Sequence, residues 1–365
     1  MSKILFNLSI VLSQPTGISN YAKNLFPFLK TLNPTLLTAQ NYPEFNCYSI
    51  PDNLTPAQGS KGHFDRLVWT QFQLPKIYEK LKSQLIFSPL PEAPLYTDCR
   101  FIVMVHDLIP LRFPKLLSPL THYSRFYVPQ VLAQAQHIIC NSHATANDII
   151  DFYHISANKI TPIPLAHDAN HFRPLHLENS RQDAQPTRCP YFLYIGRHDP
   201  YKNLHRLITA FAALSHNGEY ELWFAGPQDK RFTRLLQTQI QELGITDKVK
   251  FLNYVPYSEL PKIIHGAIAL VFPSLWEGFG FPVLEAMACG TPVITSNLSS
   301  LPEVAGDAAI VINPYNVEEM TQAMQTIATD TALRQHLSTQ SINRASQFSW
   351  EKTGLATVKV LSRYV

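Results

Sequence analysis

Short apolar runs alternate with helical segments through the second half of the chain. Five of these runs predict buried strands: YFLYIG (191–196), ELWFAG (221–226), KVKFLNYV (248–255), AIALVFPS (267–274) and TPVITSN (291–297). The segments between them place apolar residues three or four positions apart, which is typical of helices. Strand–helix alternation at this pitch predicts a parallel, doubly wound sheet.

The first half alternates in the same way, with longer irregular pieces. Four runs predict strands of a first sheet: KILFNLS (3–9), QLIFSP (84–89), RFIVMVHD (100–107) and HIICNS (137–142). A helix is expected over residues 17–30, with a kink or an early end at Pro27, because proline interrupts helical hydrogen bonding. Residues 40–65 are rich in proline, asparagine and glycine and are expected to be loop.

The length of 365 residues favours two domains. We expect the first domain over residues 1–172 and the second over residues 189–347, each a Rossmann-like α/β unit with a doubly wound parallel sheet. Residues 173–188 are polar and lack periodicity, so they are expected to be a linker. The final segment, 348–365, is a partly apolar helix that we expect to return to the first domain.

The composition excludes several classes of protein. The net charge of +3 is too small to argue for nucleic acid. It fits an anionic small ligand or a weak attraction to an anionic lipid surface. Five scattered cysteines without a C-x-x-C pair indicate buried thiols in a reducing cytosol. We expect neither a signal peptide nor a transmembrane helix, because no long apolar segment is present.

The stretch EGFGFPVLE (277–285) joins the end of a predicted strand to a helix. Ligands bind outside the carboxyl ends of parallel strands, where such loops lie. Gly278 and Gly280 would let the backbone approach a ligand, and amides at the helix start suit an anion or a sugar. Glu277 and Glu285 could accept hydrogen bonds from vicinal hydroxyl groups. Taken alone, the two glutamates could equally be solvated surface charges.

The loop GRHDPYKN (196–203) follows another predicted strand. Arg197 offers a forked set of donors and Lys202 a point charge, a pair that suits a diphosphate. By itself the loop could be a surface loop with two cations. The functional interpretation becomes stronger because both loops are expected at the same edge of the same sheet.

Three weaker signals come from single residues. Gly17 starts a helix after the first strand, which would suit the approach of a phosphate. His106 ends an apolar strand that we expect to face an interdomain cleft, where structural and functional roles are equally open. His167 and His171 have a metal-binding spacing, but the prolines around them argue against a helix and therefore against a metal.

Together these residues resemble the retaining glycosyltransferases of family 4, whose GT-B fold has two Rossmann-like domains facing each other across a cleft. The resemblance is strongest over residues 191–313, where Glu277 and Glu285 match the family's E-x7-E signature and GRHDPYKN matches its G-R-x-x-x-x-K-N pattern. FAGP, IPLAHDANHFRP and FSWEKT also resemble family segments. The first half matches more loosely: Gly17 stands where the family often has two glycines, and HDLIPLRFP is similar to mannosyltransferases.

The resemblance implies roles for the charged residues. Arg197 and Lys202 would hold the donor diphosphate, and Gly17 would let the first domain approach it. Glu285 would bind the ribose hydroxyls. His106 would lie beside the sugar and the scissile bond, through its backbone carbonyl as well as its ring.

The resemblance also implies how the sugar and base are held. Glu277 would hold the transferred sugar together with the backbone of the loop, that is, the amides of Gly278, Phe279, Gly280 and Phe281. Val255 would lie near the nucleobase, where Asn253 replaces a common glycine. No metal or other cofactor is expected.

The implied reaction is transfer of a hexose, with mannose from GDP-mannose as the best guess, to a hydroxyl of a glycan or lipid-linked acceptor. No second carboxylate is placed as a nucleophile, so front-face attack with retention is the hypothesis. A UDP-sugar is the alternative donor. A GT-B sugar-nucleotide epimerase and a non-catalytic sugar-nucleotide binder are the other classes that stay open.

Peripheral contact of this cytoplasmic protein with the inner face of the cell membrane is a further hypothesis. YAKNLFPFLK (21–30) carries Lys23 and Lys30 beside an apolar face. Such a face suits either an anionic lipid surface or the protein core, and the core is the favoured interpretation.

Overall fold

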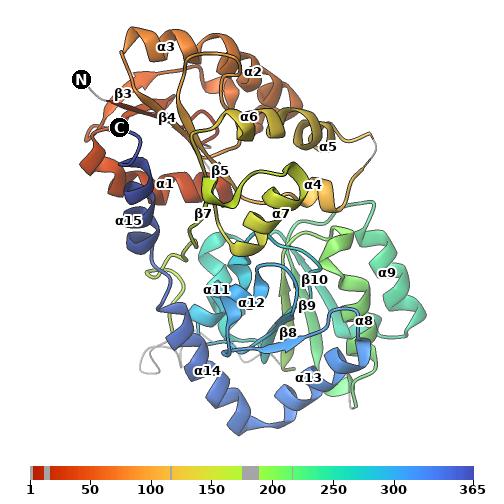
Figure 1. The fold of residues 1–365 in the computed structure, drawn as a ribbon. Helices are drawn as coiled ribbons and strands as arrows, with labels where there is room; N and C mark the ends of the chain where they lie inside the picture. Colours follow the sequence, from red (N-terminus) through yellow and green to blue (C-terminus); the bar gives the residue numbers. More distant parts are fainter. Residues whose placement is uncertain (1–2, 12–16, 116, 175–188, 216) are drawn as a thin grey trace. The chain divides into compact units, whose positions relative to one another are not determined.

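The computed structural model describes residues 3–11, 17–115, 117–174, 189–215 and 217–365. The chain divides into two compact units (Figure 1). Unit 1 comprises Met1–Leu165 and Trp350–Val365, and unit 2 comprises Ala166–Ser349. Each unit is built around one parallel sheet, so the predicted class of two doubly wound α/β domains is confirmed.

Unit 1 contains a seven-stranded parallel sheet in the order β3-β2-β1-β4-β5-β6-β7. Its strands are β1 (Ile4–Asn7), β2 (Thr35–Thr38), β3 (Asn46–Ser49), β4 (Leu85–Ser88), β5 (Phe101–Val105), β6 (His137–Cys140) and β7 (Ile160–Pro162). Its α-helices are α1 (Gly17–Leu29), α2 (Gly59–Phe72), α3 (Leu74–Lys80), α4 (Ile109–Arg112), α5 (Pro119–His122), α6 (Val128–Gln134), α7 (His143–Tyr153) and α15 (Trp350–Leu361).

Unit 2 contains a six-stranded parallel sheet in the order β10-β9-β8-β11-β12-β13. Its strands are β8 (Tyr191–Ile195), β9 (Glu221–Ala225), β10 (Val249–Asn253), β11 (Ala269–Phe272), β12 (Val293–Ser296) and β13 (Ile310–Ile312). Its α-helices are α8 (Leu204–Ala212), α9 (Thr233–Glu242), α10 (Leu260–His265), α11 (Phe281–Ala288), α12 (Leu301–Ala305), α13 (Val317–Thr329) and α14 (Thr331–Ala345).

The central strands of both sheets are buried along their whole length, as in β4, β5 and β11. Near-continuous apolar strands are typical of parallel sheets with helices on both faces. Aromatic rings link neighbouring strands: Phe6 stacks on Phe87 at 5.1 Å in unit 1, and Tyr194 stacks on Phe272 at 5.7 Å in unit 2. These rings anchor the strands on either side of the point where each strand order reverses.

Two local predictions for unit 1 are wrong. Residues 40–65 are not all loop, because β3 pairs in parallel with β2 and α2 begins at Gly59. β3 is a largely exposed edge strand, so it lacks the apolar pattern that marks a buried strand. Of the two outcomes expected at Pro27, a kink or an early end, the early end is absent, since α1 continues to Leu29. Pro27 is exposed and lies in the last turn, so it interrupts little of the helix.

The boundary between the units lies at Leu165/Ala166, before the expected position at residue 172. His171 explains the shift: its Nε2 lies 2.6 Å from the carbonyl oxygen of Tyr257, and the two rings stack at 4.1 Å. The end of the crossing segment is therefore part of unit 2. Most of the expected linker, 175–188, lies outside the described residues.

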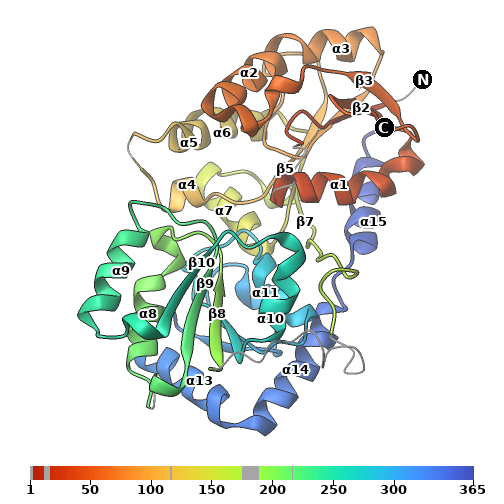
Figure 2. The ribbon, with the colours of Figure 1, turned by 180° about the vertical axis from the view of Figure 1, so that it is seen from behind.

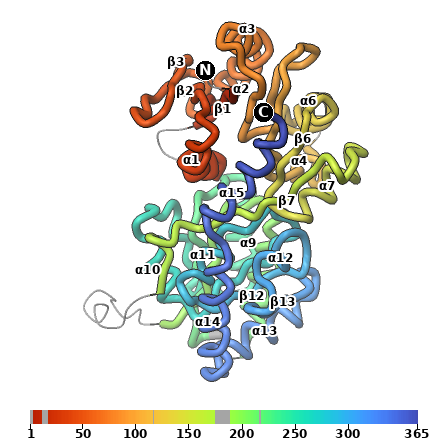
Figure 3. The backbone as a smooth tube through the Cα atoms, turned by 60° about the vertical axis from the view of Figure 1, so that its left-hand side comes forward, coloured from red at the N-terminus to blue at the C-terminus, as the bar shows by residue number. Residues whose placement is uncertain are grey.

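The C-terminal helix α15 belongs to unit 1 and packs along α1, as Figure 3 shows. Gly354 permits this close packing, because a Cβ atom there would lie 2.4 Å from Cγ of Phe28.

Candidate active site

Two predicted site residues meet where the strand order of unit 2 reverses. β8 has β9 on one side (Figure 2) and β11 on the other, so the chain runs outward from β8 in both directions. Ligands of open parallel sheets bind at the carboxyl end of this switch point. The loop after β8 carries Lys202 and the loop after β11 carries Glu277.

Lys202 and Glu277 form a buried ion pair. Lys202 Nζ donates to Glu277 Oε1 at 2.6 Å, and each side chain is 11% exposed. The ammonium group also lies 5.5 Å from the centre of the Phe272 ring. A second contact joins the loops, since the amide of Leu275 donates to the carbonyl of Tyr201 at 2.8 Å. The site therefore holds an ammonium and a carboxylate in one fixed position.

Asn203 fixes the loop that carries Lys202. Its side-chain amide is buried and donates to the carbonyls of Pro273 and Pro314, at 3.2 and 2.7 Å. Its backbone is left-handed, with φ of 62°, a conformation that asparagine tolerates better than most residues. The asparagine of the G-R-x-x-x-x-K-N pattern thus positions the lysine that precedes it.

Two serines fix the backbone of the Glu277 loop. The hydroxyl of Ser299 accepts from the amide of Glu277 at 2.9 Å and donates to its carbonyl. The hydroxyl of Ser300 donates to the carbonyl of Phe279 at 2.8 Å. Sequence reasoning assigned no role to these serines, although both follow β12 at the carboxyl edge of the same sheet.

Gly280 sets the start of α11. Its φ of +111° is unfavourable for other residues, and a Cβ atom would lie 2.8 Å from Cδ2 of Leu301. Gly278 and Phe279 precede it in the buried loop. The Phe279 ring packs edge-on to Phe281 at 5.6 Å, so the side chain belongs to the core. Pro282 has no N–H, and the amides of Val283 and Leu284 donate to the carbonyl of Gly280, at 3.1 and 3.2 Å, so Phe281 carries the candidate donor amide of the helix start.

Glu285 lies one turn inside α11 and is half-buried. Burial raises the pKa of its carboxyl to about 7. Burial, followed by the charge of Glu285, raises the pKa of Cys289 to about 12, so this thiol is neutral at physiological pH. The second carboxyl of the E-x7-E signature therefore changes its charge near neutral pH.

Arg197 does not join the Lys202–Glu277 pair. Its side chain is 67% exposed, and its Nε lies 3.2 Å from Oδ2 of Asp199. The backbone is held, because the hydroxyl of Tyr194 donates to the Arg197 carbonyl at 2.7 Å. The structure thus offers an exposed guanidinium on a fixed backbone at the same edge of the sheet.

Val255 follows β10 and is half-buried. Asn253, two residues earlier, has a left-handed backbone with φ of 57°. Its carbonyl accepts from the amide of Gly226 at 2.8 Å, and its Oδ1 accepts from Nε2 of Gln228 at 2.7 Å. Asparagine is one of the few non-glycine residues that adopt this left-handed conformation readily.

Two predicted site residues lie in unit 1. His106 follows the carboxyl end of β5, and Gly17 is the first residue of α1. His106 Nε2 lies 2.9 Å from the carbonyl of Pro89; a carbonyl can only accept, so Nε2 carries the proton. Burial lowers the pKa of His106 to about 4, so the ring is neutral near pH 7. Among the described residues, a Cβ atom on Gly17 would meet nothing within 4 Å.

Among the described residues, no group of three His, Cys, Asp or Glu side chains could hold a metal ion. His171, one of the two weighed as a metal ligand, binds Tyr257 instead. No helix in the described part of the chain is long and apolar enough to cross a membrane.

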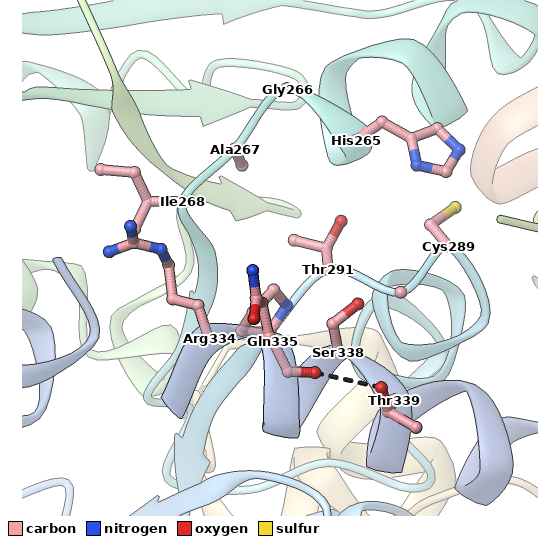
Figure 4. Close-up of a pocket in the computed structure, with 12 residues that line it drawn as sticks. His265, Gly266, Ala267, Ile268, Cys289, Thr291, Arg334, Gln335, Ser338 and Thr339 are labelled. Carbon is pink, nitrogen blue, oxygen red and sulfur yellow. Dashed lines mark hydrogen bonds between the residues drawn. The ribbon is translucent and has the colours of Figure 1, made fainter. Parts of the chain in front are cut away.

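A separate cavity of about 520 Å³ lies at the opposite edge of the unit 2 sheet (Figure 4). His265 and Ile268, before β11, and Cys289 and Thr291, before β12, line it together with α14. Arg334 of α14 also lines it, but its guanidinium donates to the carbonyls at the end of α13. The cavity is therefore remote from Lys202 and Glu277 and is not the candidate active site.

Two family models match the chain. The model described as Glycosyltransferase Family 4 matches residues 16–171, and the model described as Glycosyl transferases group 1 matches residues 177–344. The first match lies in the half of the chain that holds Gly17 and His106. The second contains the Lys202–Glu277 pair and Glu285.

Curated relatives carry mannosyltransferase names. O-antigen chain mannosyltransferase B of Escherichia coli is 30% identical over 267 residues, which cover 71% of this chain and 69% of the relative. O-antigen chain mannosyltransferase RfbU of Salmonella typhimurium is 30% identical over 62% of this chain and 60% of the relative. The serotype-specific mannosyltransferase WbdA of E. coli is 26% identical over 77% of this chain, but the match spans only 35% of that protein.

Solved glycosyltransferase structures share the fold across the chain. Sucrose-phosphate synthase from Thermosynechococcus elongatus has a TM-score of 0.76 at 18% identity, covering 99% of this chain and 98% of that one. HepE of Anabaena, solved in complex with UDP-glucose, has a TM-score of 0.74 at 18% identity, covering 99% of both chains. With both halves matched by family models and a mannosyltransferase relative at 30% identity, the chain belongs to the family 4 glycosyltransferases of the GT-B fold.

Proposed function

We propose that the chain is a retaining, metal-independent mannosyltransferase that uses GDP-mannose and acts in the cytoplasm on a glycan or lipid-linked acceptor of polysaccharide synthesis. One observation carries the catalytic part: Lys202 and Glu277 meet at the switch point, beside the amino end of α11. This arrangement supplies positive charge for a leaving diphosphate and a carboxylate for the hydroxyls of the sugar. The names of the curated relatives support mannose and polysaccharide synthesis.

In the proposed reaction, the bond between the anomeric carbon and the diphosphate oxygen breaks while the acceptor hydroxyl attacks from the same face. The sugar passes through an oxocarbenium-like state, and the acceptor proton goes to the leaving phosphate. Lys202, the exposed Arg197 and the amide of Phe281 stabilise the charge on that phosphate. His106 does not act as a protonated acid near pH 7, since burial lowers its pKa to about 4 and leaves the ring neutral.

Calorimetry with GDP and UDP, each with magnesium or with a chelator, tests the donor. We expect GDP to bind more tightly, with equal affinity in both buffers. Tighter binding of UDP would contradict GDP-mannose as the donor and favour a UDP-sugar, the kind of donor in the HepE complex. Loss of all nucleotide binding in the chelator would contradict metal independence.

Product analysis tests the reaction. We expect incubation with GDP-α-mannose and a lipid-linked glycan extract to give an α-linked mannoside by NMR. A β-linked product would contradict retention. An isomerised donor without transfer would indicate an epimerase, and binding without transfer or slow hydrolysis would indicate a non-catalytic binder.

A further inference from the structure

The outward face of α2 carries three large apolar side chains. Phe64 and Phe72 are each 65% exposed and Val68 is 40% exposed. Because they recur every four residues, they form one stripe along the helix. The opposite face packs into unit 1 through buried residues of the same helix: Gly62, Arg66, Trp69 and Thr70. A surface helix normally carries polar residues on its outer face, so this stripe indicates an interaction surface.

The inner face of α2 is fixed, which keeps the stripe outward. Arg66 forms a two-pronged ion pair with Glu92, at 2.7 and 2.8 Å, and both side chains are almost fully buried. Nε2 of Gln71 donates to the hydroxyl of Tyr127 at 3.0 Å. The helix therefore cannot turn its phenylalanines inward without breaking a buried charge pair.

Exposed lysines flank the stripe in the sequence. Lys61 lies one turn before Phe64, and Lys76 of α3 lies four residues after Phe72; both are exposed. Two acidic residues are nearby in sequence. Asp65 is half-buried and accepts from Asn53, whereas Glu79 is exposed on α3. Apolar side chains between lysines suit a lipid surface, since phenylalanine enters the acyl boundary and lysine reaches the headgroups.

The sequence suggested residues 21–30, most of which lie in α1 and not in α2, for lipid contact. Tyr21, Leu25 and Leu29 of α1 are buried. Phe26 packs edge-on against Tyr42 at 4.8 Å and contacts Phe45. The apolar face of α1 thus belongs to the core, whereas the stripe on α2 is exposed.

We propose that Phe64, Val68 and Phe72 insert into the headgroup region of an anionic phospholipid membrane, with Lys61 and Lys76 binding lipid phosphates. The stripe is too small to hold a second copy of the chain: it exposes roughly 300 Å², whereas a stable interface buries about 800 Å² per partner. A lipid surface needs no matching protein face. The proposal is independent of which donor the enzyme uses.

Vesicle flotation of the full chain tests the proposal, with phosphatidylcholine alone or mixed with phosphatidylglycerol. We expect the wild type to float with the mixed vesicles and Phe64→Ser/Phe72→Ser to lose at least about tenfold in binding. Lys61→Gln/Lys76→Gln should remove the preference for the anionic lipid. Leu235→Ser is the matched control, since Leu235 is 67% exposed on α9 of unit 2, and it should float like the wild type.

Several results would overturn the proposal. The wild type failing to float is one, and equal flotation of wild type and Phe64→Ser/Phe72→Ser is another. A dimer by light scattering that this double variant abolishes, without flotation of the wild type, would assign the stripe to self-association. Calorimetry with GDP on the same samples reports the donor site separately, so failure of membrane binding cannot be mistaken for failure of the proposed transferase function.

Discussion

At the residue scale, the Lys202–Glu277 pair has a structural and a functional role at once. The sequence predicted each residue for the site but not their contact, because the two lie on loops separated by several elements. The contact follows from topology, since β8 and β11 are neighbours in the sheet. It also means that a loss of activity in a single variant cannot be assigned to chemistry without measuring stability.

Replacing Lys202 by methionine should therefore lower both stability and turnover. We expect a loss of about 3 kcal/mol in the free energy of unfolding, because the carboxylate of Glu277 stays buried without its partner. Turnover should fall about 10²-fold or more with the charge on the leaving group unmatched. Chemical denaturation and steady-state kinetics measure the two effects.

The double variant Lys202→Met/Glu277→Gln separates the two effects. It should recover most of the lost stability, since no unpaired charge remains, and should stay inactive. Lys250→Met is the matched control, because Lys250 pairs with Glu221 at the same distance of 2.6 Å but is 48% exposed; it should cost less than about 1 kcal/mol. Wild-type turnover in the double variant would refute the proposed role of the pair.

Glu285 predicts how stability depends on pH. Burial raises its pKa from the ordinary 4.5 to about 7, so the folded state binds this proton more tightly than the unfolded chain. The stabilisation is fully present below pH 4.5 and is lost as the pH rises through 7. Between pH 5 and pH 8, Glu285→Gln should therefore gain up to about 3 kcal/mol relative to the wild type.

Denaturant titrations of both proteins at the two pH values measure this gain. Donor binding by Glu285→Gln should fall at pH 8, because the amide is a poorer acceptor for ribose hydroxyls than a carboxylate. A stability difference that does not change with pH would show that burial of Glu285 does not set its protonation.

At the element scale, the predictable parts are those with a strong apolar pattern. All five strands expected in the second half and all four expected in the first are present. Four strands were not predicted, namely β2, β3, β7 and β13, and neither was the start of α2. β3 is an exposed edge strand, β7 and β13 have only three residues each, and α2 has phenylalanines on its outer face. The exposed phenylalanines that made α2 hard to predict are also the reason to regard its outer face as an interaction surface.

The junction between the Glu277 loop and α11 depends on Gly280. Gly280→Ala should cost about 1–3 kcal/mol in stability, because alanine is strained at φ of +111° and its Cβ would press on Leu301. The shift of the helix start should also weaken GDP binding. Thermal unfolding and calorimetry provide the measurements.

Gly244→Ala is the control for this prediction. Gly244 follows α9, also has a positive φ, of +68°, and has no neighbour within 4 Å of an added Cβ. It should show the conformational cost alone and leave GDP binding unchanged. Equal loss of GDP binding in both variants would contradict a specific role for the α11 start.

At the scale of the whole molecule, strand–helix alternation was enough to predict two parallel sheets, but not the boundary between the units. The stacking of His171 on Tyr257 joins the end of the crossing segment to unit 2, and no periodic pattern encodes a single contact between distant loops. The contacts of Ser299 and Ser300 with the Glu277 loop were not predicted, for the same reason. The sequence did predict that Lys202 and Glu277 lie at the carboxyl edge of the same sheet.

The return of the chain from unit 2 to unit 1 makes the stability of unit 1 depend on α15. Gly354→Val should force α15 away from Phe28, since the glycine already leaves no room for a Cβ atom. We expect the thermal transition of unit 1 to fall while that of unit 2 stays, with faster hydrogen exchange confined to α1 and α15. Calorimetry and hydrogen-exchange mass spectrometry resolve the two units.

Two companion variants make this test specific to the contact. Leu355→Ala changes an exposed neighbour in α15, 58% exposed, and should leave both transitions in place. Gly354→Val/Phe28→Ala relieves the clash and should recover part of the lost stability. If Gly354→Val instead lowers both transitions together, the two units unfold as one cooperative body, and α15 stabilises the whole chain and not unit 1 alone.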